Sequence, residues 1–215
     1  MHYTSILFDL DGTLLDTLGD LTAAMNRTLT RHGLPERTRQ QMRTALGNGA
    51  RRLMELSVPT GTDSALFETL LAEYNADYAA HCRIETAPYP GVAALLRTLH
   101  AQGRKLAIVS NKPDEAVRAL RADFFADAVQ IAVGETAAIR RKPAPDMLLA
   151  AMEQPGAAPD KTVFVGDSEV DIATARAANL PCISVLWGFR DRDVLEQAGA
   201  QQFAADTGEL ARLLD

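Results

Sequence analysis

The feature that most constrains this chain is a short apolar run that ends in two carboxylates, Ile6-Leu7-Phe8-Asp9-Leu10-Asp11-Gly12-Thr13-Leu14. No polar residue interrupts its first part, Ile6 to Phe8, which is typical of a strand buried on both faces of a parallel sheet. Side chains two apart on a strand point the same way, so Asp9 and Asp11 start out aligned. At the carboxyl end of the strand they would face the crevice in which α/β sheets hold ligands.

Two carboxylates this close repel each other, and water does not fully screen them. A divalent cation, a shared proton or a cationic side chain would relieve the repulsion, and Mg²⁺ suits a site made only of oxygen ligands. The alternative is an acidic strand end followed by a solvated, inert turn. The Asp-x-Asp-Gly spacing alone leaves both interpretations open.

Composition limits the classes of partner. The chain has 215 residues, of which 47% are hydrophobic and 23% charged, as in a globular protein with one sizeable core or a core plus a small insert. Its net charge of -6 argues against nucleic acid or an anionic membrane as a partner. An anionic small substrate remains compatible with this charge, because a bound metal can reverse the field at one site.

The cysteines and the start of the chain bear on its location. Cys82 and Cys182 lie far apart without metal-type spacing, which favours reduced thiols in a cytoplasmic protein. A strand begins within a few residues of Met1, so we predict no signal peptide. No apolar stretch approaches the roughly 20 residues that a membrane helix needs.

After the first strand the pattern becomes helical and stays so from residue 16 to residue 84. The expected helices are 18–29, 38–46, 50–57 and one that Asp63 caps. From residue 85 onward, apolar strands alternate with helices, with strands expected at 105–109, 129–133, 162–165, 183–186 and 202–203. A turn is expected at 154–159.

Alternating strands and helices predict an α/β fold with a Rossmann-like, mostly parallel sheet. The helical segment is far longer than an ordinary connection, so we interpret it as an inserted cap domain. The expected organisation is therefore an α/β core of residues 1–15 and 85–215, with a helical cap of residues 16–84 inserted after the first strand.

Four strand ends or loops carry polar residues that could converge: Asp-Leu-Asp-Gly-Thr at 9–13, Val-Ser-Asn at 109–111, Lys-Pro-Ala-Pro at 142–145 and Gly-Asp-Ser-Glu-Val-Asp at 166–171. This set, in this order, resembles the four motifs of the haloacid dehalogenase superfamily of phosphatases. The helical insert is similar to that family's helical cap. The stretch Leu46-Gly47-Asn48-Gly49-Ala50 with Arg51 is similar to the cap loop of phosphoglycolate phosphatases.

The resemblance implies a role for each acid. Asp9 is the expected nucleophile, forming an aspartyl-phosphate. Mg²⁺ would be held by Asp9, the main-chain carbonyl of Asp11 and Asp167, and Asp171 would bind it through water or pair with Lys142. Asp11 would act as general acid and then general base, which favours a phosphate ester over a carbon–halogen bond as the target.

Each of the remaining candidates has a plain structural alternative. Ser110 and the amides around Asn111 would bind phosphoryl oxygens at a helix start, or Ser110 simply caps that helix. Gly12 and Thr13 form a phosphate cradle or only a turn. Lys142 pairs with Asp9 and the phosphoryl group, or is a solvated loop lysine.

The same choice applies to Asp171 and to the cap. Asp171 is a site residue or a first-turn helix acid. In the cap, Gly47, Asn48 and Gly49 would press main chain against the substrate while Arg51 or Arg52 meets its carboxylate. Their alternative is a helix-breaking turn followed by two solvated arginines.

The predicted function is Mg²⁺-dependent hydrolysis of a small phosphorylated metabolite, with 2-phosphoglycolate as the leading candidate, by a cytoplasmic monomer or homodimer. Three alternatives stay open. They are a sugar phosphomutase, a pyrophosphate or nucleotide phosphatase, and a non-catalytic phosphate-binding regulatory module. Asp11 argues against the last, since binding alone does not require a second acid.

Overall fold

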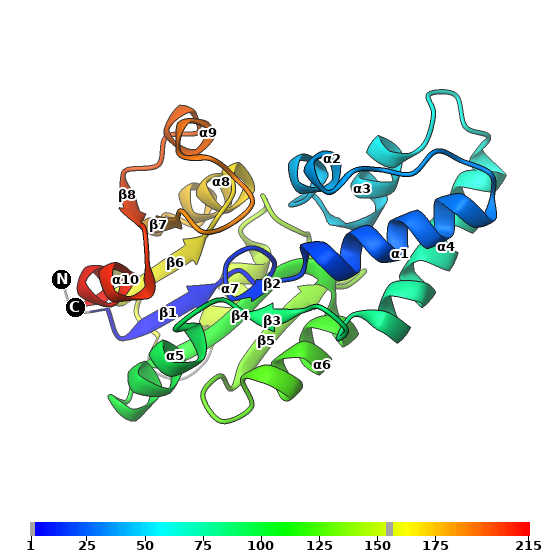
Figure 1. Cartoon of the computed structure of the whole chain (residues 1–215). Helices are drawn as coiled ribbons and strands as arrows, with labels where there is room; N and C mark the ends of the chain where they lie inside the picture. Colours follow the sequence, from blue (N-terminus) through cyan, green and yellow to red (C-terminus); the bar gives the residue numbers. More distant parts are fainter. Residues whose placement is uncertain (1–2, 154–156) are drawn as a thin grey trace. The chain divides into compact units, whose positions relative to one another are not determined.

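The computed structural model describes residues 3–153 and 157–215, and the chain divides into two compact units (Figure 1). The first unit contains the residues up to Leu15 together with Pro88–Asp215, and the second contains Asp16–Ala87. In the described residues, no helix combines the length and the apolar character that crossing a bilayer requires.

A six-stranded parallel sheet forms the centre of the first unit. Its strands, in spatial order, are β5 (Ile131–Glu135), β4 (Lys105–Pro113), β1 (Ser5–Phe8), β6 (Thr162–Gly166), β7 (Cys182–Val185) and β8 (Gln202–Ala204). All pairings between neighbouring strands are parallel, as the alternating pattern predicts.

The order of the strands fixes where a site can form. From β1 the sheet runs one way through β4 and β5 and the other way through β6, β7 and β8. Phe8, the last residue of β1, pairs with Ile108 on one side and Val165 on the other. The carboxyl end of β1 is therefore the point at which the strand order reverses, where open α/β sheets bind ligands.

Both faces of the sheet are covered. Ile6, Leu7 and Phe8 follow one another and are all completely buried, although alternate side chains of a strand point to opposite faces. One core cluster joins Leu7 and Phe164 of the sheet to apolar residues of α7 (Asp146–Met152) and α8 (Glu169–Ala177). The other helices of this unit are α5 (Val92–Ala101), α6 (Asp114–Phe124), α9 (Arg192–Gln197), α10 (Thr207–Leu214) and the short 3₁₀ helix η1 (Pro159–Lys161).

The second unit is helical, as predicted, and consists of α1 (Leu18–Arg31), α2 (Arg39–Ala45), α3 (Gly49–Ser57) and α4 (Ser64–His81). Asp63 caps α4 as expected, since its carboxylate accepts hydrogen bonds from the N–H groups of Ala65 and Leu66. Two-residue strands, β2 (Leu15–Asp16) and β3 (Ala87–Pro88), pair with each other where the chain passes between the units.

A buried carboxylate ties the end of the helical unit to its beginning. Asp20, in the first turn of α1, is only 3% exposed and accepts hydrogen bonds from the N–H groups of Ile84, Glu85 and Thr86. Three charge-assisted bonds compensate the burial of the carboxylate. They also hold the returning chain close to the start of the insert.

The largest difference from the predicted elements lies in β4, which extends from residue 105 to residue 113 instead of ending at 109. Ser110 and Asn111 therefore lie within the strand, and α6 begins only at Asp114. Ser110 is therefore not at a helix start and does not cap a helix, and a phosphate contact by this residue stays a prediction. The extension follows from tertiary pairing, because Pro113 pairs with Glu135 of β5 after an irregularity in register.

Smaller differences concern element boundaries. The strand expected at 129–133 is observed at Ile131–Glu135, and Asp171 lies in the first turn of α8, which begins at Glu169. Residues 154–156 of the turn expected at 154–159 fall outside the described residues, and Pro159 opens η1.

Candidate active site

Three buried carboxylates gather at the carboxyl ends of β1 and β6. Asp9, Asp167 and Asp171 each offer an oxygen that lies within 4.8 Å of the other two. Asp9 directly follows β1, and its N–H donates to the carbonyl of Val165 at 2.9 Å, so strand pairing continues up to this carboxylate. Asp167 directly follows β6, and Asp171 lies in the first turn of α8. The structure thus brings together acids that are more than 150 positions apart in the sequence.

Lys142 supplies the positive charge of this cluster. Its Nζ lies 2.8 Å from Asp9 Oδ1 and 2.7 Å from Asp171 Oδ1, and its side chain is only 2% exposed. The structure therefore contradicts the interpretation of Lys142 as a solvated loop lysine. The cation lies at the reactive end of the sheet, in contact with the proposed nucleophile.

Asp171 combines two of the roles that the sequence left open. One oxygen accepts from Lys142, and the other accepts from the N–H of Ser168 at 3.1 Å and from its hydroxyl at 2.6 Å. The residue is both the partner of Lys142 and the acid of a capping box at the start of α8. These contacts hold its carboxylate in one orientation.

The side chain of Asn111 fixes the backbone of Lys142. Its amide donates to the Lys142 carbonyl at 3.0 Å, and its side-chain oxygen accepts from the Lys142 N–H at 2.8 Å. The sequence predicts only main-chain contacts of Asn111 with a phosphoryl group. The clamp was not predicted, because nothing in the pattern shows that β4 and the Lys142 loop lie together.

Asp167 is held by groups from two loops. Its Oδ1 accepts from the Thr13 hydroxyl at 3.0 Å, and its Oδ2 accepts from the N–H of Phe189 at 2.7 Å. Trp187 extends this support, since its indole N–H donates to the Thr13 carbonyl at 3.0 Å. Trp187 and Phe189 belong to a loop that positions a site carboxylate.

The Gly12–Thr13 turn shows why a glycine is needed here. Gly12 has a φ of 86°, and a Cβ at this position would lie 2.4 Å from Asp167 Oδ2. The N–H groups of Gly12 and Thr13 donate to the carbonyls of Leu15 and Leu10, so both amides take part in the turn. The turn is therefore observed, and a phosphate cradle at these two residues stays a prediction.

Burial and like charge dominate the electrostatics of the site. Burial raises the pKa of Asp9 well above its ordinary value, and the charge of Lys142 offsets only part of this. Burial together with the charge of Asp171 raises the pKa of Asp167 to about 7, against the hydrogen bonds from Phe189 and Thr13. Burial alone would lower the pKa of Lys142, but the charges of Asp171 and Asp9 raise it overall.

This donor set fits a hard divalent cation. The cluster offers carboxylate oxygens only, which suits Mg²⁺ better than a metal that prefers nitrogen or sulfur ligands. Asp9, Asp167 and Asp171 are each also engaged by protein donors, and all three are candidate carboxylates for such an ion. A second cation beside Lys142 would also offset the charge that burial makes unfavourable.

A second lysine, which is not among the predicted site residues, lies against Asp11. Lys112 Nζ is 3.0 Å from Asp11 Oδ2, and the side chains are 5% and 20% exposed. Lys112 comes from the unpredicted extension of β4, next to Ser110 and Asn111. Each of the two acids at the end of β1 therefore has its own lysine.

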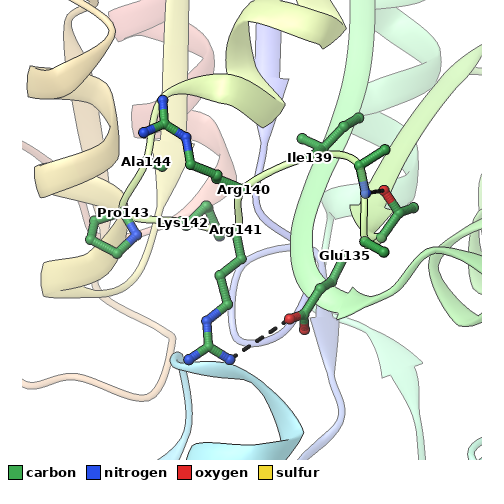
Figure 2. A pocket seen from close by; sticks show the side chains of 10 residues that line it. Glu135, Ile139, Arg140, Arg141, Lys142, Pro143 and Ala144 are labelled. Carbon is green, nitrogen blue, oxygen red and sulfur yellow. Dashed lines mark hydrogen bonds and ion pairs between the residues drawn. The ribbon is translucent and has the colours of Figure 1, made fainter.

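The loop that carries Lys142 lines a hollow of about 640 Å³ formed by residues 135–144, and Figure 2 shows its side chains. Arg140 pairs with Asp146 at 2.8 Å, and Arg141 lies 3.8 Å from Glu135. Each of the two arginines therefore has an acidic partner. Lys142 is the basic residue of this loop that contacts the carboxylate cluster.

The predicted cap residues lie in the second unit. Gly47 and Gly49 have positive φ values of 111° and 76° and flank Asn48 in the turn before α3, which fits a helix-breaking turn. Arg51 forms a paired contact with Glu68, at 2.9 Å for both nitrogens, and lies over the ring of Phe67. A substrate contact by these residues stays a prediction.

Comparison with known proteins gives a family match over most of the chain. The family described as haloacid dehalogenase-like hydrolase matches residues 6–185. A phosphoglycolate phosphatase of Xanthomonas campestris pv. campestris is 35% identical over 187 residues, which cover 86% of this chain and 84% of the relative. An N-acetylmuramic acid 6-phosphate phosphatase of Pseudomonas aeruginosa is 31% identical over 217 residues, covering 100% of this chain and 96% of the relative.

A solved structure supports the same family match. The crystal structure of a candidate phosphoglycolate phosphatase from Lactobacillus delbrueckii subsp. bulgaricus superposes with a TM-score of 0.94 and is 35% identical. The match covers 100% of this chain and 99% of that chain.

The central role of Lys142 predicts the effect of removing its charge. In Lys142→Met, two buried carboxylates lose their counter-charge, so the free energy of unfolding should fall by about 3 kcal/mol or more. Urea unfolding at pH 7, followed by the fluorescence of Trp187 in the same unit, measures this. The matched control is Lys161→Met, an exposed lysine of the same unit, which should change little. Equal stabilities of the two variants would contradict the assignment.

Proposed function

Because this chain belongs to the haloacid dehalogenase-like hydrolase family and is a phosphoric monoester hydrolase similar to phosphoglycolate phosphatases, we propose that Asp9 is its nucleophile in a Mg²⁺-dependent reaction. The observation that carries the proposal is the placement of Asp9. Its carboxylate is buried at the end of β1, in contact with Lys142 and within reach of Asp167. A carboxylate has no structural need of such a site, and burial there costs free energy.

In the first step an oxygen of Asp9 attacks phosphorus and the bond between phosphorus and the leaving oxygen breaks. Lys142, 2.8 Å from Asp9, offsets the negative charge that gathers on the nucleophile and the phosphoryl group. Asp11 gives a proton to the leaving oxygen, so the alcohol departs neutral. Bound Mg²⁺, held by Asp9, Asp167 and the Asp11 carbonyl, would supply further charge neutralisation.

In the second step a water oxygen attacks the phosphorus of the aspartyl-phosphate. Asp11, now a carboxylate, takes a proton from that water while the bond between phosphorus and Asp9 breaks. Inorganic phosphate leaves and both acids return to their initial states. The buried hydroxyl of Ser110 and the residues around Asn111 are the proposed contacts for phosphoryl oxygens.

The substrate proposal rests on the two named relatives. Both names describe phosphomonoesters of a carboxylic acid, glycolate in one and N-acetylmuramic acid in the other. We therefore propose a phosphorylated acid, with 2-phosphoglycolate first. N-acetylmuramic acid 6-phosphate is second, supported by the alignment with that relative over 100% of this chain. The cap residues Asn48 and Arg51 are the proposed substrate-recognition residues. The protein is proposed to act in the cytoplasm as a monomer or homodimer.

Replacing the nucleophile tests the chemistry. Asp9→Asn keeps the volume of the side chain but removes the attacking carboxylate, so phosphate release should fall at least about 10⁴-fold. Phosphate release is measured with 2-phosphoglycolate and p-nitrophenyl phosphate, and mass spectrometry verifies that the asparagine has not deamidated. Asp160→Asn, an exposed aspartate of the same unit, is the control. Substantial activity in verified Asp9→Asn would refute Asp9 as the nucleophile.

Metal removal tests the second part of the proposal. Protein treated with EDTA and then desalted should lose activity, because Asp9 and Asp167 are then close to each other without a divalent cation. Mg²⁺ should restore it, and Ca²⁺ should restore it poorly, since Ca²⁺ prefers longer bonds and more ligands. Full activity in rigorously metal-free protein would overturn the Mg²⁺ requirement.

A substrate panel separates the candidates. The value of kcat/KM should be highest for a phosphorylated acid, and we expect 2-phosphoglycolate to exceed glycerol 3-phosphate by at least about 10-fold, equivalent to about 1.4 kcal/mol of selective binding. The panel adds N-acetylmuramic acid 6-phosphate, a nucleoside monophosphate, pyrophosphate and glucose 1-phosphate. Isomerisation of the sugar phosphate without phosphate release would instead identify a phosphomutase.

A further inference from the structure

The ion pair between Lys112 and Asp11 has no role in the proposed mechanism described above. Lys112 Nζ lies 3.0 Å from Asp11 Oδ2, and the lysine side chain is only 5% exposed. Burying an ammonium group costs free energy unless an opposite charge pairs with it, so the contact with Asp11 stabilises Lys112 in this position. Asp11 is the acid that the proposed mechanism assigns to the leaving oxygen.

Two lysines contact different acids at the carboxyl end of β1. Lys142 contacts Asp9 and Asp171, and Lys112 contacts Asp11. Lys112 and Asp11 both lie in the first unit, on β4 and just beyond β1, which are paired parallel strands. The strand pairing therefore sets the distance between the two side chains before any substrate binds.

The backbone around Lys112 is also fixed. Its N–H donates to the Ser110 hydroxyl at 3.4 Å, and the Asn111 amide next to it is engaged with the backbone of Lys142. Gly134 of β5 approaches closely, since a Cβ there would lie 2.8 Å from the carbonyl oxygen of Lys112. A lysine on such a rigid segment can hold its partner in one orientation.

We propose that Lys112 is a positioning residue, which holds the Asp11 carboxyl group in the orientation needed for proton transfer to the leaving oxygen. This inference rests on the proposed function, because it assigns Asp11 to that transfer. Lys112 itself forms no bond to the substrate in this account. Its removal should therefore slow both proton transfers by Asp11, to the leaving oxygen in the first step and from water in the second, without removing the nucleophile Asp9.

The leaving group of the substrate gives a readout that a purely structural role would not change. An alkyl phosphate such as 2-phosphoglycolate needs its leaving oxygen protonated, whereas p-nitrophenolate leaves without a proton. In Lys112→Met, the single-turnover rate of glycolate release from 2-phosphoglycolate should fall about 10²-fold, as expected for a displaced catalytic group. The single-turnover rate of p-nitrophenolate release from p-nitrophenyl phosphate should fall less than about 10-fold, and KM should stay within about 3-fold for both substrates.

Asp11→Asn provides the reference for this pattern and separates the two hypotheses. If Asp11→Asn shows no preference between the two leaving groups, the proposed role of Asp11 fails. If Asp11→Asn discriminates but Lys112→Met does not, only the positioning role of Lys112 fails. The double variant Asp11→Asn/Lys112→Met should lose no more activity on 2-phosphoglycolate than Asp11→Asn alone, because the two residues act as one unit.

Two control measurements separate the proposed role from unfolding and from a general effect of losing a lysine. Urea unfolding compares Lys112→Met and the polar variant Lys112→Gln with the unaltered protein, and whichever is folded at 25 °C is used for the kinetics. Lys161→Met controls for loss of a lysine elsewhere in the same unit. Equal losses on both substrates, or a rise in KM confined to the carboxylate-bearing substrate, would overturn the proposal and assign Lys112 to stability or to substrate binding.

Discussion

The site depends on one buried ammonium group held between two carboxylates. Lys142 contacts Asp9 and Asp171 at 2.8 and 2.7 Å, in surroundings where each of the three groups would be unstable alone. Two carboxylates and one ammonium still leave negative charge at this point, and Asp167 adds to it. This excess negative charge raises the free energy of the buried cluster, and it also favours the binding of a divalent cation.

Around this centre, contacts from neighbouring residues restrict the positions of the proposed reacting groups. Asn111 clamps the backbone of Lys142, and the loop containing Trp187 and Phe189 holds Thr13 and Asp167. Gly12 leaves room for the Asp167 carboxylate. Catalytic groups must be held within fractions of an ångström, and these contacts come from three segments of the chain, around Gly12, Asn111 and Phe189. The parallel sheet brings those segments to one edge.

Much of this arrangement could be predicted from sequence, because it depends on local patterns. The uninterrupted apolar run before Asp9 predicted a central parallel strand, and the four motifs predicted which acids and which lysine converge. The contacts of Asn111, Trp187 and Phe189 could not be predicted, since they join segments whose proximity only the folded sheet creates. The extension of β4 through Lys112 was missed for the same reason, because its pairing with β5 is tertiary.

The division between the two lysines has a consequence for how substrates are distinguished. In the proposed mechanism, the groups around Asp9, Lys142 and Asp167 act on the phosphoryl group, which every phosphomonoester shares. In the same mechanism Asp11 acts on the leaving alcohol, so differences between substrates begin there. A partner that fixes Asp11 in the first unit makes proton transfer independent of the alcohol's size and shape. Choice of substrate then falls to groups that contact the rest of the alcohol, which explains how similar cores can serve relatives named for a two-carbon acid and for an amino sugar acid.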